Sequence, residues 1–98
     1  MKAGDMAAAR AAFERALEIR QALAAADKTD LEAKLDVVRS ILLFDRLPVD
    51  ARGPAHIKRL RAAKATLDAK AAKGQIAGDE AREKIRDKVL SALAEPRR

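Results

Sequence analysis

Apolar residues recur every three or four positions along the first quarter of the chain, which is the spacing of one face of an α-helix. Gly4 and Asp5 make a suitable start, because an aspartate can cap the first backbone N–H groups of a helix. The stretch ADKTD, residues 26–30, then breaks the pattern. We therefore expect a helix over about 5–25, whose apolar face holds Met6, Ala9, Phe13, Ala16, Leu17, Ile19 and Leu23.

The second apolar stripe is the richest in the chain. Thr29 or Asp30 can cap its start, and Pro48 stops it, because proline cannot continue a helix and restrains the residue before it. A loop, PVDARG, follows. The pattern predicts a helix over 30–47 with a buried face of Leu31, Leu35, Val38, Ile41, Leu42 and Phe44.

Two further helices complete the predicted fold. Pro54 suits the first turn of a helix over 54–73, and Gly74 can end it in a left-handed backbone conformation. Asp79 can cap a fourth helix over 79–94. No segment alternates with a period of two for long enough to form a strand, so the expected fold is all-α.

The spacing Ala9-x3-Phe13-x2-Ala16, with Gly4 in front of it, resembles the second helix of a tetratricopeptide repeat (TPR). The run ALEIRQALAAADKTDLEAKLDVV is similar to the extended repeats of kinesin-light-chain type and of many bacterial TPR proteins. Gln21 stands where a shorter repeat would have proline. The resemblance covers about one and a half repeats.

This resemblance implies antiparallel helical hairpins in a single TPR-like domain over residues 1–98. The segment 5–25 takes the place of the second helix of one repeat, 30–73 forms the next repeat, and 79–94 is a capping helix. The alanine–aromatic–alanine spacing returns in weaker form as His56, Leu60 and Ala63.

A TPR helix such as 5–25 normally packs on the helix before it, and we expect none in the sequence ahead of it. Repeats also stabilise one another mainly through their neighbours. Three possibilities for the helix that packs against 5–25 stay open: another part of a longer array, the helix over 79–94 folding back, or a second copy of the chain. We favour a homo-oligomer with Phe13 and Leu17 near the contact.

Charge is unevenly distributed within the net charge of +6. Residues 1–50 hold eight bases and nine acids, whereas residues 51–98 hold thirteen bases and six acids. The absence of cysteine excludes disulfides and zinc–thiolate sites. No apolar run approaches the roughly 20 residues of a membrane span, and the N-terminus lacks the apolar core of a signal peptide. A soluble, cytoplasmic protein is expected.

Few side chains are candidates for catalysis. His56 is the only histidine, and we interpret it as a partly exposed residue in the first turn of the third helix. No base lies at helical spacing from the hydroxyl residues Thr29, Ser40, Thr66 and Ser91, and the glycines form no phosphate-binding loop. The acids around residue 30 lack the pattern of a calcium loop. We expect no enzyme, no cofactor and no metal site.

The function that we expect is that of a protein–protein interaction module or scaffold that binds a peptide or helix of a partner. By resemblance, its binding surface is built mainly from the helix over 30–47, whose outward candidates are Lys34, Asp36, Arg39 and Ser40. Some family members clamp a C-terminal carboxylate with a set that includes asparagine. This chain has no asparagine, so that activity is not carried over.

The basic segment 52–73 leaves nucleic-acid binding as the alternative. Lys58, Arg61 and Lys64 lie on one side of the helix over 54–73 and would neutralise phosphates there. No aromatic residue interrupts the row, so base stacking is unsupported. An acidic protein partner suits the same charges and is favoured. Membrane binding is not expected, because the apolar faces are needed for the core.

Overall fold

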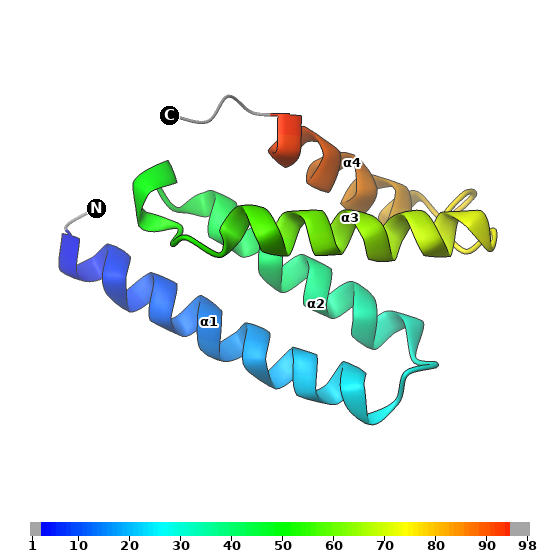
Figure 1. The fold of residues 1–98 in the computed structure, drawn as a ribbon, viewed down its shortest axis with the longest axis horizontal. Helices are drawn as coiled ribbons and strands as arrows, with labels where there is room; N and C mark the ends of the chain where they lie inside the picture. Colours follow the sequence, from blue (N-terminus) through cyan, green and yellow to red (C-terminus); the bar gives the residue numbers. More distant parts are fainter. Residues whose placement is uncertain (1–2, 95–98) are drawn as a thin grey trace.

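The computed structural model describes residues 3–94, and this range folds into four α-helices joined by short turns (Figure 1). They are α1 (Ala3–Ala26), α2 (Leu31–Leu43), α3 (His56–Ala72) and α4 (Glu80–Ala94). Two single-turn 3-10 helices, Phe44–Arg46 and Val49–Ala51, connect α2 to α3. No strand occurs between residues 3 and 94, so the all-α prediction is confirmed.

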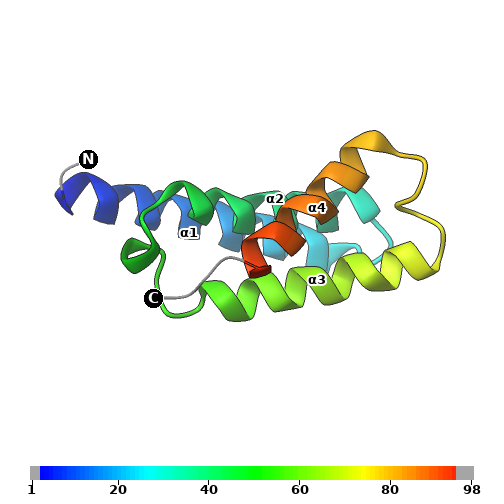
Figure 2. The ribbon, with the colours of Figure 1, turned by 90° about the horizontal axis from the view of Figure 1, so that it is seen from above.

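The helix α2 lies at the centre of the fold. It packs along α1 on one side and against α3 and α4 on the other, and α4 also packs on α3. Figure 2 shows α1 and α2 in one layer and α3 in a second. The single TPR-like domain, with its hairpin arrangement, stays a prediction.

Three of the predicted helix ends are present as expected. The carboxylate of Asp30 accepts a hydrogen bond of 3.0 Å from the backbone N–H of Ala33 at the start of α2. Asp79 accepts one of 3.1 Å from the N–H of Arg82 at the start of α4. Gly74 follows α3 with φ of +73°, the left-handed conformation that a residue without a Cβ adopts readily.

Other helix ends differ from the prediction. The helix α1 begins at Ala3, so Asp5 lies inside its first turn, where its charge complements the helix dipole. The helix α2 ends at Leu43, because the chain tightens into a 3-10 turn before it reaches Pro48. The helix α3 begins at His56, after a turn at Gly53 that has φ of +91°.

The core lies where α2 meets the other three helices. The Phe44 ring is fully buried at the end of α2, and the half-buried Phe13 ring packs against it edge-on with 5.8 Å between ring centres. The other large side chains buried to the same degree come from all four helices: Leu17, Leu35, Val38, Leu60, Leu67 and Val89.

The helix α1 presents its apolar residues differently from the prediction. Leu17 was expected at a contact with a second copy, but it is 1% exposed within the chain's own core. Ile19 and Leu23 were expected on the buried face, but they are 52% and 62% exposed. Apolar residues lie all round this helix, and it packs on α2 with only one of its faces.

Two polar residues are buried that were expected at the surface. His56 is 3% exposed, and its Nε2 lies 2.8 Å from a carboxylate oxygen of Asp45. Ser40 is fully buried, and its hydroxyl donates to the backbone oxygen of Asp36 and accepts a hydrogen bond of 2.6 Å from Arg20 of α1. Both therefore hold elements of the fold together.

Candidate interaction groove

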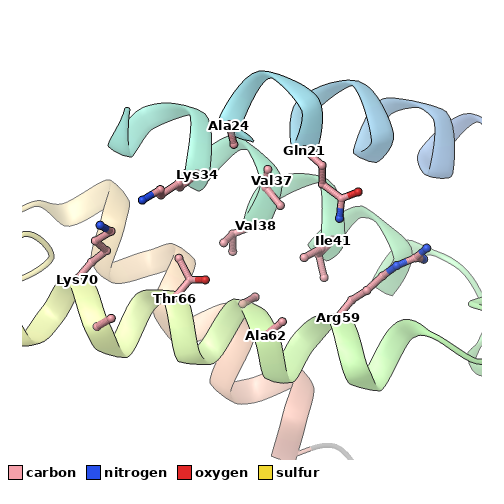
Figure 3. Close-up of a pocket in the computed structure, with 12 residues that line it drawn as sticks. Gln21, Ala24, Lys34, Val37, Val38, Ile41, Arg59, Ala62, Thr66 and Lys70 are labelled. Atoms are coloured by element: carbon pink, nitrogen blue, oxygen red, sulfur yellow. The ribbon is translucent and has the colours of Figure 1, made fainter. Parts of the chain in front are cut away.

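A groove of about 450 Å³ lies between α1 and α3, with α2 as its floor (Figure 3). Both α1 and α3 pack on α2. The space between them stays open along its middle, because the side chains that α3 directs there, between Arg59 and Lys70, are short. Most of the lining is apolar: Ala24, Val37, Val38, Ile41, Ala62, Ala63 and Ala69.

Two lysines reach the same end of the groove from different helices. Lys34 extends from α2 and Lys70 from α3, and their amino groups lie toward one another in Figure 3. The pKa of Lys70 lies below its ordinary value, chiefly because its side chain is at hydrogen-bond distance from that of Lys34. Desolvation and the like charges of Lys34 and Lys73 act in the same direction. This end of the groove therefore concentrates positive charge.

No carboxylate of residues 3–94 forms an ion pair with Lys34 or Lys70. The other end of the groove is different. There Arg59 donates a hydrogen bond of 3.3 Å to Glu14 of α1, and its guanidinium carbon lies 5.2 Å from the centre of the Phe44 ring. One end therefore holds a contact ion pair. At the other end the charge of Lys34 contributes, after the hydrogen bonds from Thr29, to lowering the pKa of Asp27, but the two side chains form no ion pair.

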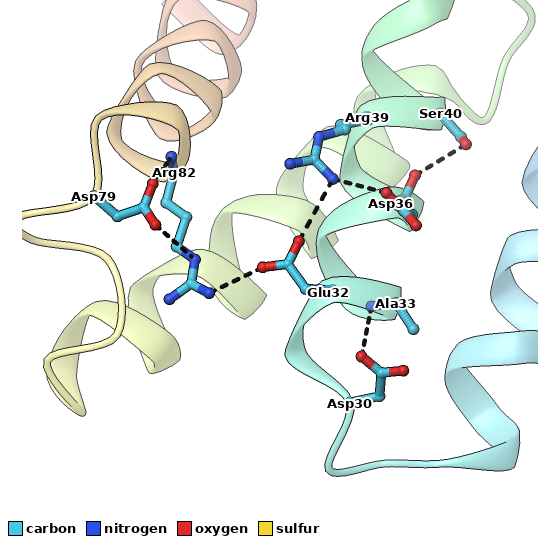
Figure 4. Close-up of polar contacts among 8 residues, drawn as sticks. All are labelled: Asp30, Glu32, Ala33, Asp36, Arg39, Ser40, Asp79 and Arg82. Carbon is cyan, nitrogen blue, oxygen red and sulfur yellow. Dashed lines mark hydrogen bonds and ion pairs between the residues drawn. The ribbon is translucent and has the colours of Figure 1, made fainter.

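The structure separates the two predicted binding residues of α2. Lys34 lines the groove, whereas Arg39 lies on the side of α2 that faces α4 (Figure 4). Arg39 pairs with Asp36 at 2.7 Å and with Glu32 at 4.0 Å, and Glu32 also pairs with Arg82 of α4 at 2.9 Å. The charge of Arg39 is thus balanced within the chain.

The predicted basic row of α3 also lies outside the groove. Lys58, Arg61 and Lys64 are exposed and do not line it. Lys64 pairs with Asp68 at 2.7 Å, and Asp68 also pairs with Arg86 of α4 at 3.0 Å. Hydrogen bonds from these two bases lower the pKa of Asp68 below its ordinary value.

Sequence reasoning missed the groove formed by Lys70 and the small residues of α3 that precede it. A signal was present, because small residues of α3 recur at helical spacing between two bases: Arg59, Ala62, Ala63, Thr66, Ala69 and Lys70. Such a stripe is as typical of a solvent-exposed helix side as of a groove wall. Only the position of α1 relative to α3 distinguishes the two.

A second groove, of about 590 Å³, lies between α2 and α4. Its lining combines apolar side chains with charges of both signs, among them Arg39, Asp45, Arg46, Asp87 and Lys88. Three bases and two acids line this groove, so its charge is largely balanced, unlike that of the first groove, which is lined by bases and no acid.

The chain matches no protein-family model, and neither a curated protein nor a solved structure is similar to it. Within residues 3–94 no three His, Cys, Asp or Glu side chains are grouped so that they could hold a metal ion. None of the helices in that range combines the length and the hydrophobicity needed to cross a membrane.

Proposed function

We propose that the protein is a non-enzymatic protein–protein interaction module that binds an acidic, amphipathic helix of a partner in the groove between α1 and α3. The observation that carries this proposal is an apolar groove with two ammonium groups at one end, Lys34 and Lys70, that form no ion pair within residues 3–94. An amphipathic helix laid in an apolar groove is one of the recurring modes of peptide recognition.

The length of the groove suits about three turns of helix. From Arg59 to Lys70 the helix α3 advances by about 16 Å, at about 1.5 Å per residue. An occupant of similar length would place apolar anchors at positions i, i+3 or i+4 and i+7 over Val37, Val38 and Ile41. The occupant is therefore a short helical segment.

The charge at Lys34 and Lys70 sets the orientation of that segment. Two ammonium groups that face one another are unfavourable in the empty groove, and a carboxylate between them converts the repulsion into charge-assisted hydrogen bonds. The C-terminal end of a helix carries partial negative charge of its own. We therefore place the acidic side chains in the last turn of the partner helix, at the lysine end.

The test is titration of the protein with a synthetic helical peptide of about three turns, followed by fluorescence anisotropy. The peptide carries leucines at i, i+3 and i+7 and two glutamates in its last turn. Lys34→Glu/Lys70→Glu should weaken binding by at least about tenfold, because the carboxylates then meet like charge. The matched control Lys58→Glu/Arg61→Glu changes the net charge equally outside the groove and should weaken binding less than about threefold.

Equal losses in the two double variants would contradict the proposal, as would the absence of peptide binding to the unaltered protein. A second peptide with lysines in place of the two glutamates should bind at least about tenfold more weakly than the first. If the two peptides bind equally, the lysine pair does not select the partner.

Nucleic acid is the second candidate, since Lys58 and Arg61 are exposed and form no ion pair with an acid of residues 3–94. The same double variants separate the two functions when short duplex DNA replaces the peptide. Nucleic-acid binding requires loss of duplex affinity in Lys58→Glu/Arg61→Glu and a steep fall of affinity with salt. We favour the acidic helix, because the apolar groove has no role in binding phosphates.

A further inference from the structure

The two lysines at the end of the groove share one small space. Lys34 enters it from α2 and Lys70 from α3, and both side chains are half-buried, with their amino groups toward one another (Figure 3). The two side chains lie at hydrogen-bond distance, yet an ammonium group donates hydrogen bonds and accepts none. An anion seated over the pair would therefore contact both amino groups at once.

A third donor lies one helical turn before Lys70. Thr66 lines the groove on the same wall, between Lys70 and Ala62 (Figure 3). Residues 66 and 70 are four positions apart and so share one side of α3. The Thr66 hydroxyl forms no side-chain hydrogen bond within residues 3–94. Three donors, two of them charged, therefore line this end of the groove.

No acid is among the side chains that line the groove. The charge of Lys34 reaches Asp27, but that carboxylate already accepts hydrogen bonds of 3.0 and 2.6 Å from Thr29, and these lower its pKa more than Lys34 does. The charge of Lys73 adds to that around Lys70. A single carboxylate would therefore balance only one of the two ammonium charges.

We infer that the lysine end of the groove is a site for a phosphoryl group, carried by a phosphoserine in the last turn of the partner helix. The inference rests on the proposed function, because it concerns the same groove and the same helix. A phosphoryl group carries a charge of about −1.5 to −2 near neutral pH and has three acceptor oxygens. One such group matches both ammonium charges and leaves an oxygen for the Thr66 hydroxyl.

Two carboxylates meet the same charges less well. Each is held on a side chain of its own, so the two must come close together to contact amino groups that are at hydrogen-bond distance from each other. Like charges at such a separation are unfavourable, whereas a phosphoryl group holds its oxygens on one atom. An unmodified serine offers the lysine pair no charge, so phosphorylation of the partner acts as a switch for binding.

The test compares three peptides by fluorescence anisotropy, each with the leucine anchors described above. The last turn of the first carries two glutamates, that of the second one phosphoserine and one alanine, and that of the third one serine and one alanine. The first two have nearly the same charge, so the cost of negative charge at the C-terminal end of their own helix is nearly the same. The phosphoserine peptide should bind at least about fivefold more tightly than the two-glutamate peptide and at least about fiftyfold more tightly than the serine peptide.

The pH dependence of binding identifies the phosphoryl group. Its second proton is lost with a pKa of about 6, so the affinity of the phosphoserine peptide should rise between about pH 5.5 and pH 7.5. The carboxyl groups of the two-glutamate peptide are ionised throughout that range. That peptide therefore reports any change in the protein itself.

Variants of the protein test the bridging contact. Lys34→Gln and Lys70→Gln each remove one charge and should reduce the preference for phosphoserine over two glutamates to less than about twofold. Thr66→Val keeps the branched shape without the hydroxyl and should weaken the phosphoserine peptide by about threefold. The control Lys58→Gln removes a charge outside the groove and should leave the preference unchanged. Circular dichroism should show equal helicity in all four variants, since every altered side chain is half-buried or exposed.

Equal affinity for the phosphoserine and two-glutamate peptides would overturn the inference and leave the proposed function intact. Failure of all three peptides to bind would overturn both. Inorganic phosphate, which lacks the apolar anchors, should displace the phosphoserine peptide only at concentrations at least about a hundredfold above the Kd of that peptide. Displacement at the Kd itself would indicate a site for free phosphate and would overturn the assignment to a partner helix.

Discussion

Charged side chains on the two sides of α2 differ in whether they form ion pairs. Toward α4, Arg39 is paired with acids of its own helix, and Glu32 is paired with Arg82 of α4. Toward α1 and α3, Lys34 extends to Lys70 and forms no ion pair with a carboxylate of residues 3–94. Its charge acts on Asp27 only as a lesser cause, after the Thr29 hydrogen bonds, of the lowered pKa of that carboxyl group. Lys34 and Arg39 are only five residues apart on one helix.

From this difference we conclude that a lysine or arginine indicates a binding site better when it forms no ion pair in the fold. Its position on a helix surface alone is a weaker indication. Exposed ion pairs contribute little to stability, so the pairs beside α4 serve mainly to neutralise that surface. The lysine pair forms no such ion pairs within residues 3–94. The proposed function assigns its charge to the carboxylates of a partner helix.

The largest loss of stability should come from substitution of Phe44, which lies beneath both sides of α2. Its ring is fully buried against Phe13, and the Arg59 guanidinium lies 5.2 Å from its centre. Phe44→Ala should cost about 3–5 kcal/mol in the free energy of unfolding, because it leaves a cavity in the core. Urea denaturation measures this. Val49→Ala, at an exposed site, should change stability by less than about 0.5 kcal/mol.

A loss below about 1 kcal/mol for Phe44→Ala would show that the α2 end does not support the two grooves.

The next effect should come from Asp45 at the end of α2. Its carboxylate lies 2.8 Å from His56 Nε2, and the Nδ1 of that buried ring has no hydrogen-bond partner. Asp45→Ala should cost about 1–3 kcal/mol, because it removes the carboxylate from the buried imidazole and also from the Arg52 guanidinium 3.7 Å away. Equilibrium unfolding in urea is the measurement. The exposed Asp50→Ala serves as control, and equal losses in the two variants would contradict a structural role for the Asp45–His56 pair.

A smaller loss of stability is expected from substitutions on the side of α2 that faces α4, where the charges form ion pairs. Arg82 donates hydrogen bonds of 2.9 Å to the backbone oxygen of Gln75 and to Glu32, whose side chain is 62% exposed. Arg82→Ala should therefore lower the free energy of unfolding by less than about 1 kcal/mol. Binding of the acidic peptide should stay unchanged, since Arg82 does not line the groove. A large loss of peptide binding would break the comparison between the two sides.

The smallest effect on stability should be a gain, from the variant Lys70→Ala. Lys70→Ala removes one of two like charges, so the melting temperature should rise slightly at neutral pH. Because the folded state lowers the pKa of Lys70, the unfolded chain holds this proton to a higher pH. Stability should therefore rise with pH through the window between that lowered pKa and the ordinary value of 10.5.

Melting curves of the unaltered protein and of Lys70→Ala at increasing pH measure this difference, which should shrink as pH passes 10.5. Lys58→Ala, outside the groove, is the control and should show no such convergence. A lower melting temperature for Lys70→Ala at neutral pH would mean that the lysine pair is not strained.

The sequence was sufficient to predict the four helices, since each has a period and a stop of its own. Caps at Asp30 and Asp79 and the end at Gly74 were predictable, because they depend on neighbouring residues. The face that each helix buries was harder to predict. In α1, Leu17 and Ile19 are both apolar and two residues apart, and only the position of α2 decides which is buried.

The candidate groove was predictable only in part. Lys34 could be found because it lies on the richest helix, but Lys70 becomes its neighbour only after α3 has packed across α2. The partner of Glu32, Arg82, is 50 positions away along the chain. Local patterns carry no information about pairs at such separations.

The way in which α1 is held has a consequence for motion. Among the fully buried large side chains, Leu17 is its only contribution, and α2 is the only helix on which it packs extensively. Such an element opens locally at a lower free energy than the rest of a domain, so we expect its backbone amides to exchange with deuterium before those of α2.

One wall of the groove lies on this helix, at Gln21 and Ala24. A ligand in the groove therefore also orders α1, and the entropy cost of that ordering is subtracted from its affinity. We expect the acidic peptide to slow deuterium exchange at the α1 amides more than at those of α4.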